Sequence, residues 1–130
     1  RFEREVQLTA QLVHPNTVAI YDYGRTPEGV FYYAMEYLPG VTMARLIDLE
    51  RRLPAERVVH LLRQVCCALR EAHSTGLVHR DIKPPNIMVN RLGGESDVVK
   101  VLDFGLVKDV AGAQEDIVLS REDVVSGTPA

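Results

Sequence analysis

The stretch HRDIKPPN at residues 79–86 decides the interpretation of this 130-residue chain. It places a carboxylate at Asp81, a cation at Lys83 and a carboxamide at Asn86 within a few positions of one another. A second carboxylate, Asp103, opens the tripeptide DFG further along the chain. Oxygen ligands of this kind suit Mg²⁺, which takes one or two carboxylates and leaves its other positions to water and phosphate. The charges therefore predict a site that binds and neutralises a transferring phosphoryl group.

The segments around this stretch indicate how the polar residues come together. Short apolar runs lie at residues 77–78, 87–89 and 98–102, and Gly93-Gly94 suits a turn between the last two. We expect three short strands, with Asp81 on the loop between the first and the second. Pairing of the last two strands as a hairpin would bring Asn86 and Asp103 into the same neighbourhood.

The first half of the chain predicts helices on either side of a strand pair. The first segment predicts a helix, since apolar or small residues recur there at helical spacing: Phe2, Val6, Thr9 and Val13. The sequence HPN at residues 14–16 then stops this helix. Residues 18–23 and 30–37 have the composition of antiparallel strands. A short amphipathic helix follows Pro39-Gly40. From Pro54 to about residue 74, apolar residues keep a 3.6-residue period, with Gly76 just past the end, which predicts a long helix.

The composition excludes several classes of protein. With 46% hydrophobic and 25% charged residues, the chain is an ordinary globular protein rather than a disordered or collagen-like one. Its formal charge of -3 provides no basic field for nucleic acid, and no apolar run is long enough to span a membrane. The adjacent Cys66 and Cys67 cannot bridge without distortion, which favours a reducing, cytoplasmic location. The histidines have no chelating spacing, so we predict no metal other than Mg²⁺.

At residues 79–86 and 103–105 the sequence resembles the eukaryotic-type protein kinase family. The catalytic-loop and DFG motifs stand in the family's order, and the segments HPNTVAIYDYG and SGTPA look most like bacterial serine/threonine kinases. The resemblance implies an α+β, protein-kinase-like two-lobe fold in truncated form. Residues 1–37 would be part of the small lobe, with the αC helix and the strands after it. Residues 38–130 would be the first part of the large lobe.

The resemblance also implies roles for the residues of the two motifs. Asp81 corresponds to the catalytic base, and Lys83 to the residue that steadies the γ-phosphate of ATP. A lysine two residues after the aspartate is the serine/threonine-kinase pattern. Asn86 and Asp103 correspond to the Mg²⁺ ligands. Arg80 is of the type that pairs with a phosphorylated activation loop.

Residues outside the motifs would complete the ATP site. Glu36 and Leu38 resemble the hinge, whose backbone groups bind the adenine edge, and Met88 would be the apolar floor beneath it. Glu5 lies where the family keeps the glutamate that pairs with the ATP-binding lysine. Thr128 would contact the catalytic aspartate. His79 and Phe104 are expected to be buried supports, and Ser120 and Ser126 are hydroxyls at positions suited to loop phosphorylation.

Three functions fit these residues. The first is a protein serine/threonine kinase that uses ATP and Mg²⁺, with proteins, itself included, as phosphate acceptors. The second is a kinase-like pseudoenzyme or binding module, and the third is a sugar or antibiotic phosphotransferase, which Lys83 and the GTP segment disfavour. The complete polar set favours the first. The family's glycine-rich loop, ATP-contacting lysine and Ala-Pro-Glu motif do not occur in these 130 residues. We therefore expect an incomplete catalytic domain and a poor enzyme by itself, whose parent protein can carry a membrane anchor elsewhere.

Overall fold

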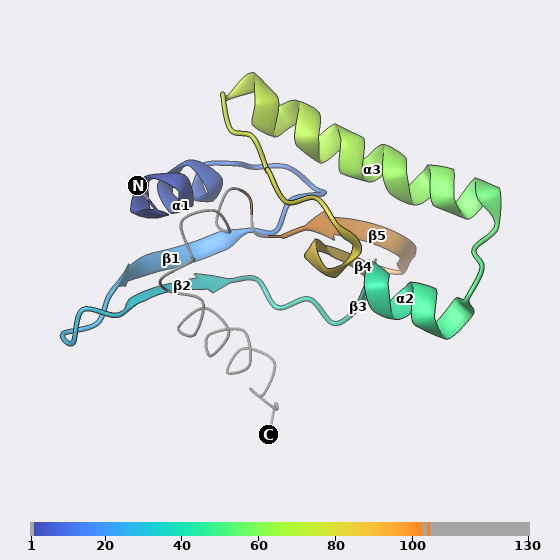
Figure 1. The fold of residues 1–130 in the computed structure, drawn as a ribbon, viewed down its shortest axis with the longest axis horizontal. Coiled ribbons are helices and arrows are strands. Elements are labelled where there is room, and N and C mark those ends of the chain that lie inside the picture. Colours follow the sequence, from blue (N-terminus) through green and yellow to red (C-terminus); the bar gives the residue numbers. More distant parts are fainter. Residues whose placement is uncertain (1, 103, 105–130) are drawn as a thin grey trace.

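The computed structural model describes residues 2–102 and 104, which form a mixed helix and sheet fold (Figure 1). The elements follow one another as α1 (Phe2–Ala10), β1 (Ile20–Arg25), β2 (Phe31–Met35), β3 (Val41–Thr42), α2 (Met43–Glu50), α3 (Ala55–Ser74), the 3₁₀ turn η1 (Pro84–Asn86), β4 (Ile87–Leu92) and β5 (Glu95–Val101). The predicted α+β class is therefore confirmed.

The strands form two small sheets that are linked to each other. β1 and β2 pair antiparallel, and β3, β4 and β5 form a second antiparallel sheet in that order. The chain before β1 bridges them, because the Val18 N–H donates to the Val101 carbonyl at 3.1 Å and the Val101 N–H donates to the Asn16 carbonyl at 2.8 Å. The end of β5 is thereby tied to the start of the two-stranded sheet.

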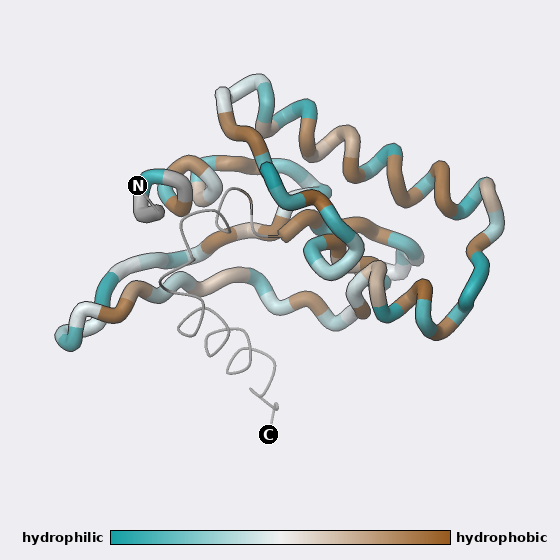
Figure 2. Tube along the Cα trace, in the orientation of Figure 1, coloured by the Kyte–Doolittle hydropathy of each residue, from teal (hydrophilic) through white to brown (hydrophobic). Residues whose placement is uncertain are grey.

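Helix α3 covers one face of the β3-β4-β5 sheet (Figure 1). Its buried stripe lies against the alternate residues of β4 and β5 that point the same way, as their shared core cluster shows: Leu61, Val65, Ala68, Ala72, Ile87, Val89, Val99 and Val101. Figure 2 shows brown, hydrophobic stretches alternating with teal, hydrophilic ones along α3. Burial of one such valine or leucine contributes about 1.5–3 kcal/mol, so this stripe fixes the helix on the sheet.

An ion pair anchors the beginning of α3 to the far end of the β4–β5 hairpin. The Arg57 guanidinium donates to both carboxylate oxygens of Asp97 at 2.8 Å each. These hydrogen bonds, followed by the attraction of the two charges, lower the pKa of Asp97 and raise the pKa of Arg57. Bidentate geometry of this kind holds the two elements in one register.

The predicted helices and hairpin are present, with changes at their ends. The long helix begins at Ala55, directly after Pro54, and Gly76 has the left-handed φ of +81° expected past its end. The Gly93-Gly94 turn between β4 and β5 is also confirmed. The first strand begins at Ile20 rather than residue 18, because the residues before it bond to Val101 instead.

Two predictions of secondary structure were wrong. The first helix ends at Ala10, and Val13, predicted on its apolar stripe, is 90% exposed. Pro15 disfavours helical backbone only in the residue before it, His14, so it does not explain why the helix ends at Ala10. Residues 77–78 form no strand, because the Leu77 N–H bonds to the Ala72 carbonyl at 3.0 Å and closes the end of α3. The short strand Val41–Thr42 was not predicted.

No helix in the described residues 2–102 has both the length and the apolar composition needed to cross a bilayer.

Candidate active site

Asn86 is the structural centre of the loop at residues 79–86. It is buried at the end of η1, where its N–H donates to the Lys83 carbonyl and its carbonyl accepts from the Leu102 N–H, each at 2.9 Å. Its side-chain amide nitrogen donates to both the carbonyl and Oδ2 of Asp81 at 3.0 Å. One carboxamide thus fixes Asp81 to the end of the β4–β5 hairpin.

Among the described residues, only one oxygen of the Asp81 carboxylate has partners. Oδ2 accepts from Asn86 and lies 3.2 Å from the Lys83 ammonium. The Asp81 side chain is 26% exposed and that of Lys83 is 50% exposed, so both reach solvent. Among the described residues, Oδ1 of Asp81 accepts no hydrogen bond. The structure therefore brings together Asp81, Lys83 and Asn86 and leaves one carboxylate oxygen available to a bound group.

His79 supports this loop from below, as predicted for a buried residue. It is 2% exposed, and its Nε2 lies 2.6 Å from the Leu102 carbonyl while its Nδ1 accepts the Asp81 N–H at 3.1 Å. Because a carbonyl only accepts and an amide N–H only donates, Nε2 carries the proton and the imidazole is neutral. The ring also meets the buried Phe104 ring edge to face, with centroids 4.7 Å apart. Phe104 in turn accepts from Thr9 of α1, which links the loop to that helix.

Arg80 lies between His79 and Asp81 in the sequence, and its backbone has a sparsely populated conformation. Its φ of +70° is left-handed, which costs a non-glycine residue about 1–3 kcal/mol. This backbone conformation changes the direction of the chain at Arg80. The residue before it, His79, is therefore buried, while the residue after it, Asp81, is turned toward solvent.

The predicted hinge, residues 36–40, lies between β2 and β3 as a segment without helix or strand structure. Within the described part of the chain, neither the N–H nor the carbonyl of Leu38 makes a hydrogen bond. Such free backbone groups can bind the edge of a planar heterocycle. Met88, the predicted floor, is half-buried on β4, opposite Thr42 of β3 and Lys100 of β5.

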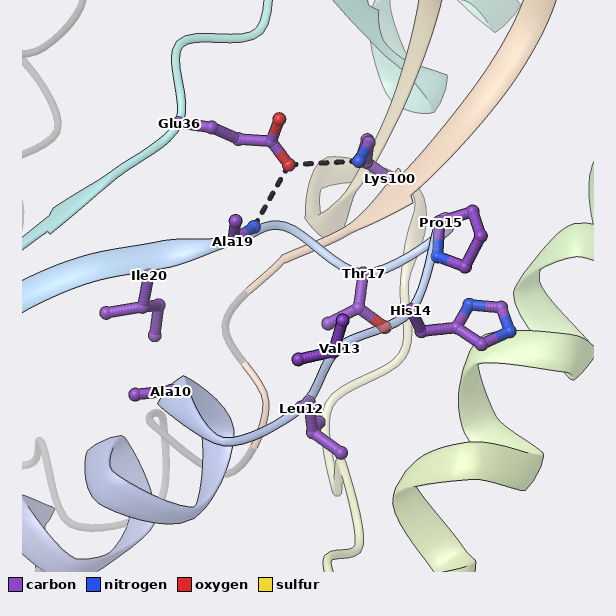
Figure 3. A pocket seen from close by; sticks show the side chains of 10 residues that line it. All are labelled: Ala10, Leu12, Val13, His14, Pro15, Thr17, Ala19, Ile20, Glu36 and Lys100. Atoms are coloured by element: carbon purple, nitrogen blue, oxygen red, sulfur yellow. Dashed lines mark hydrogen bonds and ion pairs between the residues drawn. The ribbon is translucent and has the colours of Figure 1, made fainter.

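The side chain of Glu36 has a partner that the sequence analysis did not identify. Its Oε1 lies 3.0 Å from the Lys100 ammonium and accepts the Ala19 N–H at 3.0 Å (Figure 3). The sequence does contain a signal for this pair. Lys100 is the only charged residue in the apolar run at residues 98–102, and a charge in a buried strand needs a partner. Its partner lies far away in the sequence, which the run itself does not indicate.

The remaining predicted residues fall outside the described ones. Glu5 belongs to α1, but its side chain is not among those that the structure describes. Asp103 and Thr128 lie outside the described residues altogether. Ser120 and Ser126 likewise lie outside residues 2–102 and 104. The second expected ligand for Mg²⁺ is therefore not placed relative to Asn86.

The chain is similar to known proteins over most of its length. The chain matches the protein kinase domain over residues 1–130. It is 41% identical over 129 residues to the serine/threonine-protein kinase pkn3 of Myxococcus xanthus, which is 99% of this chain and 24% of that protein. It is 38% identical over 120 residues to PknB of Mycobacterium tuberculosis (90% of this chain, 18% of that protein) and 39% identical over 106 residues to PrkC of Bacillus subtilis (82% and 16%). The chain thus spans a quarter or less of the length of these relatives. It belongs to the protein kinase family.

Proposed function

We propose that the protein containing this chain is a serine/threonine kinase that transfers the γ-phosphoryl group of ATP to hydroxyl groups of proteins. The observation that carries the proposal is the arrangement of Asp81, whose Oδ2 is held by Lys83 and Asn86 while its Oδ1 accepts no hydrogen bond from the residues that the structure describes. A carboxylate that is held in this way can align the acceptor hydroxyl because its own orientation does not change. The relatives support the acceptor class, since those named above are serine/threonine-protein kinases.

In this proposal the loop residues divide the chemistry among themselves. Asp81 accepts the proton of the acceptor hydroxyl at Oδ1 as that oxygen attacks phosphorus. Lys83 has the exposure and reach to move from Asp81 to the transferring phosphoryl group, where its charge offsets the developing negative charge. Asn86 and His79 keep Asp81 in place, so the proton acceptor needs little rearrangement during the reaction.

The donor set of Asn86 fits a magnesium ion. Its amide nitrogen is used by Asp81, while its amide oxygen accepts no hydrogen bond among the described residues. A carboxamide oxygen is a suitable hard ligand for Mg²⁺, and Asp103 would be the second ligand. Mg²⁺ supplies positive charge that neutralises the phosphate oxygens. Leu38 would bind adenine through its backbone and Met88 would lie beneath the ring.

Other parts of the proposal concern regions and residues with supporting roles. Residues 1–37 and 38–130 would belong to the two lobes of the kinase domain. Glu5, Arg80 and Thr128 would order the site. The catalytic domain would work in the cytoplasm, where ATP is available, and Ser120 and Ser126 would be candidate sites of autophosphorylation.

The test uses the full-length protein with Mg·ATP labelled at the γ-phosphate and a generic protein acceptor. We expect labelled phosphoserine or phosphothreonine, and loss of labelling in Asp103→Asn. The control Asp48→Asn, the same substitution on the exposed face of α2, should keep full labelling. Equal labelling by Asp103→Asn would contradict the mechanism. Nucleotide binding without transfer would identify a pseudoenzyme, and labelling of a sugar or an aminoglycoside rather than a protein would identify the third class.

A further inference from the structure

The segment that connects the two sheets, residues 36–40, is fixed at its first residue by a nearly buried ion pair. The side chains of Glu36 and Lys100 are 19% and 13% exposed, and their charged atoms are 3.0 Å apart. The same carboxylate oxygen accepts the Ala19 N–H, while the Glu36 N–H donates to the Ala19 carbonyl at 2.9 Å. Backbone and side chain of Glu36 are therefore both fixed, with β1 on one side and β5 on the other.

This ion pair lines one side of a pocket of about 420 Å³, so it keeps some contact with solvent (Figure 3). In the figure the Glu36 carboxylate points toward Lys100 and Ala19. Because the pair is mostly enclosed, salt screens it less than it screens an exposed surface pair.

The other end of the same segment is fixed by Asn90. The Gly40 N–H donates to Oδ1 of Asn90 at 2.9 Å, and Nδ2 of Asn90 donates to the Val98 carbonyl at 3.3 Å. Asn90 is 3% exposed, so this amide has one orientation. A Cβ atom on residue 40 would overlap the Val89 carbonyl oxygen, which explains why only glycine allows the segment to approach β4 so closely.

Both anchors lie on the face of the hairpin that carries Met88. Lys100 is directly opposite Met88 in the β4–β5 register, and Asn90 is two residues along the same strand. Leu38, whose backbone groups make no hydrogen bond to the described residues, lies in the chain between the two fixed ends. The hinge backbone and the proposed adenine floor are thus held by one rigid hairpin.

We infer that Lys100 and Asn90 are positioning residues for the nucleotide: they hold residues 36–40 at both ends over Met88, so that the Leu38 backbone meets adenine in a fixed geometry. The inference rests on the proposed function. A preorganised site loses less conformational entropy when the ligand binds, so release of either end should weaken nucleotide binding more than it slows phosphoryl transfer.

The test measures the KM for ATP and kcat of the full-length protein, with binding of a fluorescent ATP analogue as a second readout. In Lys100→Met we expect the KM and the dissociation constant to rise about three- to tenfold, as for partial loss of one charge-assisted hydrogen bond, with a smaller change in kcat. Lys100→Arg, which keeps the charge, should restore most of the affinity. If Lys100→Met does not fold, Glu36→Gln removes the same charge pair at nearly constant volume and should give the same shift.

The matched control is Arg57→Met, which removes the ion pair at the opposite end of the same hairpin. It should lower the melting temperature and leave the KM for ATP unchanged. An unchanged KM in both Lys100→Met and Glu36→Gln, or an equal rise in Arg57→Met, would overturn the inference while leaving the proposed function intact. A wild-type protein that binds no nucleotide would overturn the proposed function and this inference with it.

Discussion

The loop at residues 79–86 and the hinge segment at residues 36–40 differ in the chemical groups that they present. The loop presents side chains, with Asp81 and Lys83 turned toward solvent above Asn86. The hinge presents backbone groups at Leu38, and its side-chain contacts hold only its ends. In the proposed kinase, the first arrangement suits chemistry at phosphorus, and the second suits binding of a planar base.

The two regions also differ in how their contacts depend on one another. In the loop, Asn86, His79 and Asp81 share hydrogen bonds, so one substitution affects several groups. In the hinge, the Glu36 and Gly40 anchors are separate. We therefore expect loop variants to lower kcat steeply, and hinge variants to raise the KM for ATP in smaller steps.

The largest of the structural effects should come from Asn86→Ala. This change removes the two hydrogen bonds that the Asn86 amide nitrogen donates to Asp81 and the amide oxygen proposed for Mg²⁺, so kcat should fall about a hundredfold or more. The KM for ATP should change less, because the hinge contacts remain. Steady-state kinetics at varied Mg·ATP would check this, and a kcat near that of the wild type would remove Asn86 from the proposed machinery.

The next effect should come from His79→Phe. The substitution removes the partner of the buried Leu102 carbonyl and of the part-buried Asp81 N–H, which should lower the free energy of unfolding by about 2–4 kcal/mol. Urea denaturation measures the loss, and kcat should fall with it because Asp81 is released. His73→Phe, at the exposed end of α3, should change stability by less than about 0.5 kcal/mol. Equal effects of the two substitutions would contradict the role assigned to His79.

A smaller effect is expected at the hinge from Gly40→Ala. The added methyl group overlaps the Val89 carbonyl oxygen, so the segment must shift away from β4 at a cost of about 1–3 kcal/mol. The KM for ATP should rise with little change in kcat. Gly24→Ala is the control, because its methyl group would meet only the movable end of the Tyr32 side chain. A KM that changes equally in both variants would argue against close packing at residue 40.

The smallest effect concerns the ion pair at the far end of the hairpin, away from both regions. Arg57 holds the pKa of Asp97 below its ordinary value of 3.8, so the carboxylate contributes stability above that pH and loses it as the pH falls below 3.8. Asp97→Asn should cost about 1 kcal/mol near neutral pH, and the difference from the wild type should shrink in acid. Thermal melts across pH measure this. A difference that grows below pH 3.8 would have the wrong sign.

The difference between the regions also explains what the sequence could predict. The loop was predictable because its side chains carry the chemistry, and α3 was predictable because its apolar period runs unbroken over many turns. The pairing of Glu36 with Lys100 was not, since it joins residues that are distant in the chain. Gly40 appeared in the sequence as a break before the next helix, whereas the structure gives it a packing role that depends on β4. Leu77 was predicted in a strand because local composition does not show that its N–H closes a helix end.

The central claim, that the loop carries the chemistry while the hinge carries the binding, is tested most directly by Asp81→Asn in the full-length protein. Phosphoryl transfer and Mg·ATP affinity are measured on the same preparation, with Asp48→Asn as the matched control. Transfer should fall by about 10²- to 10⁴-fold, as for loss of a general base, while the dissociation constant for Mg·ATP stays within about twofold. Undiminished transfer by Asp81→Asn, or a loss of nucleotide affinity as large as the loss of transfer, would contradict the account.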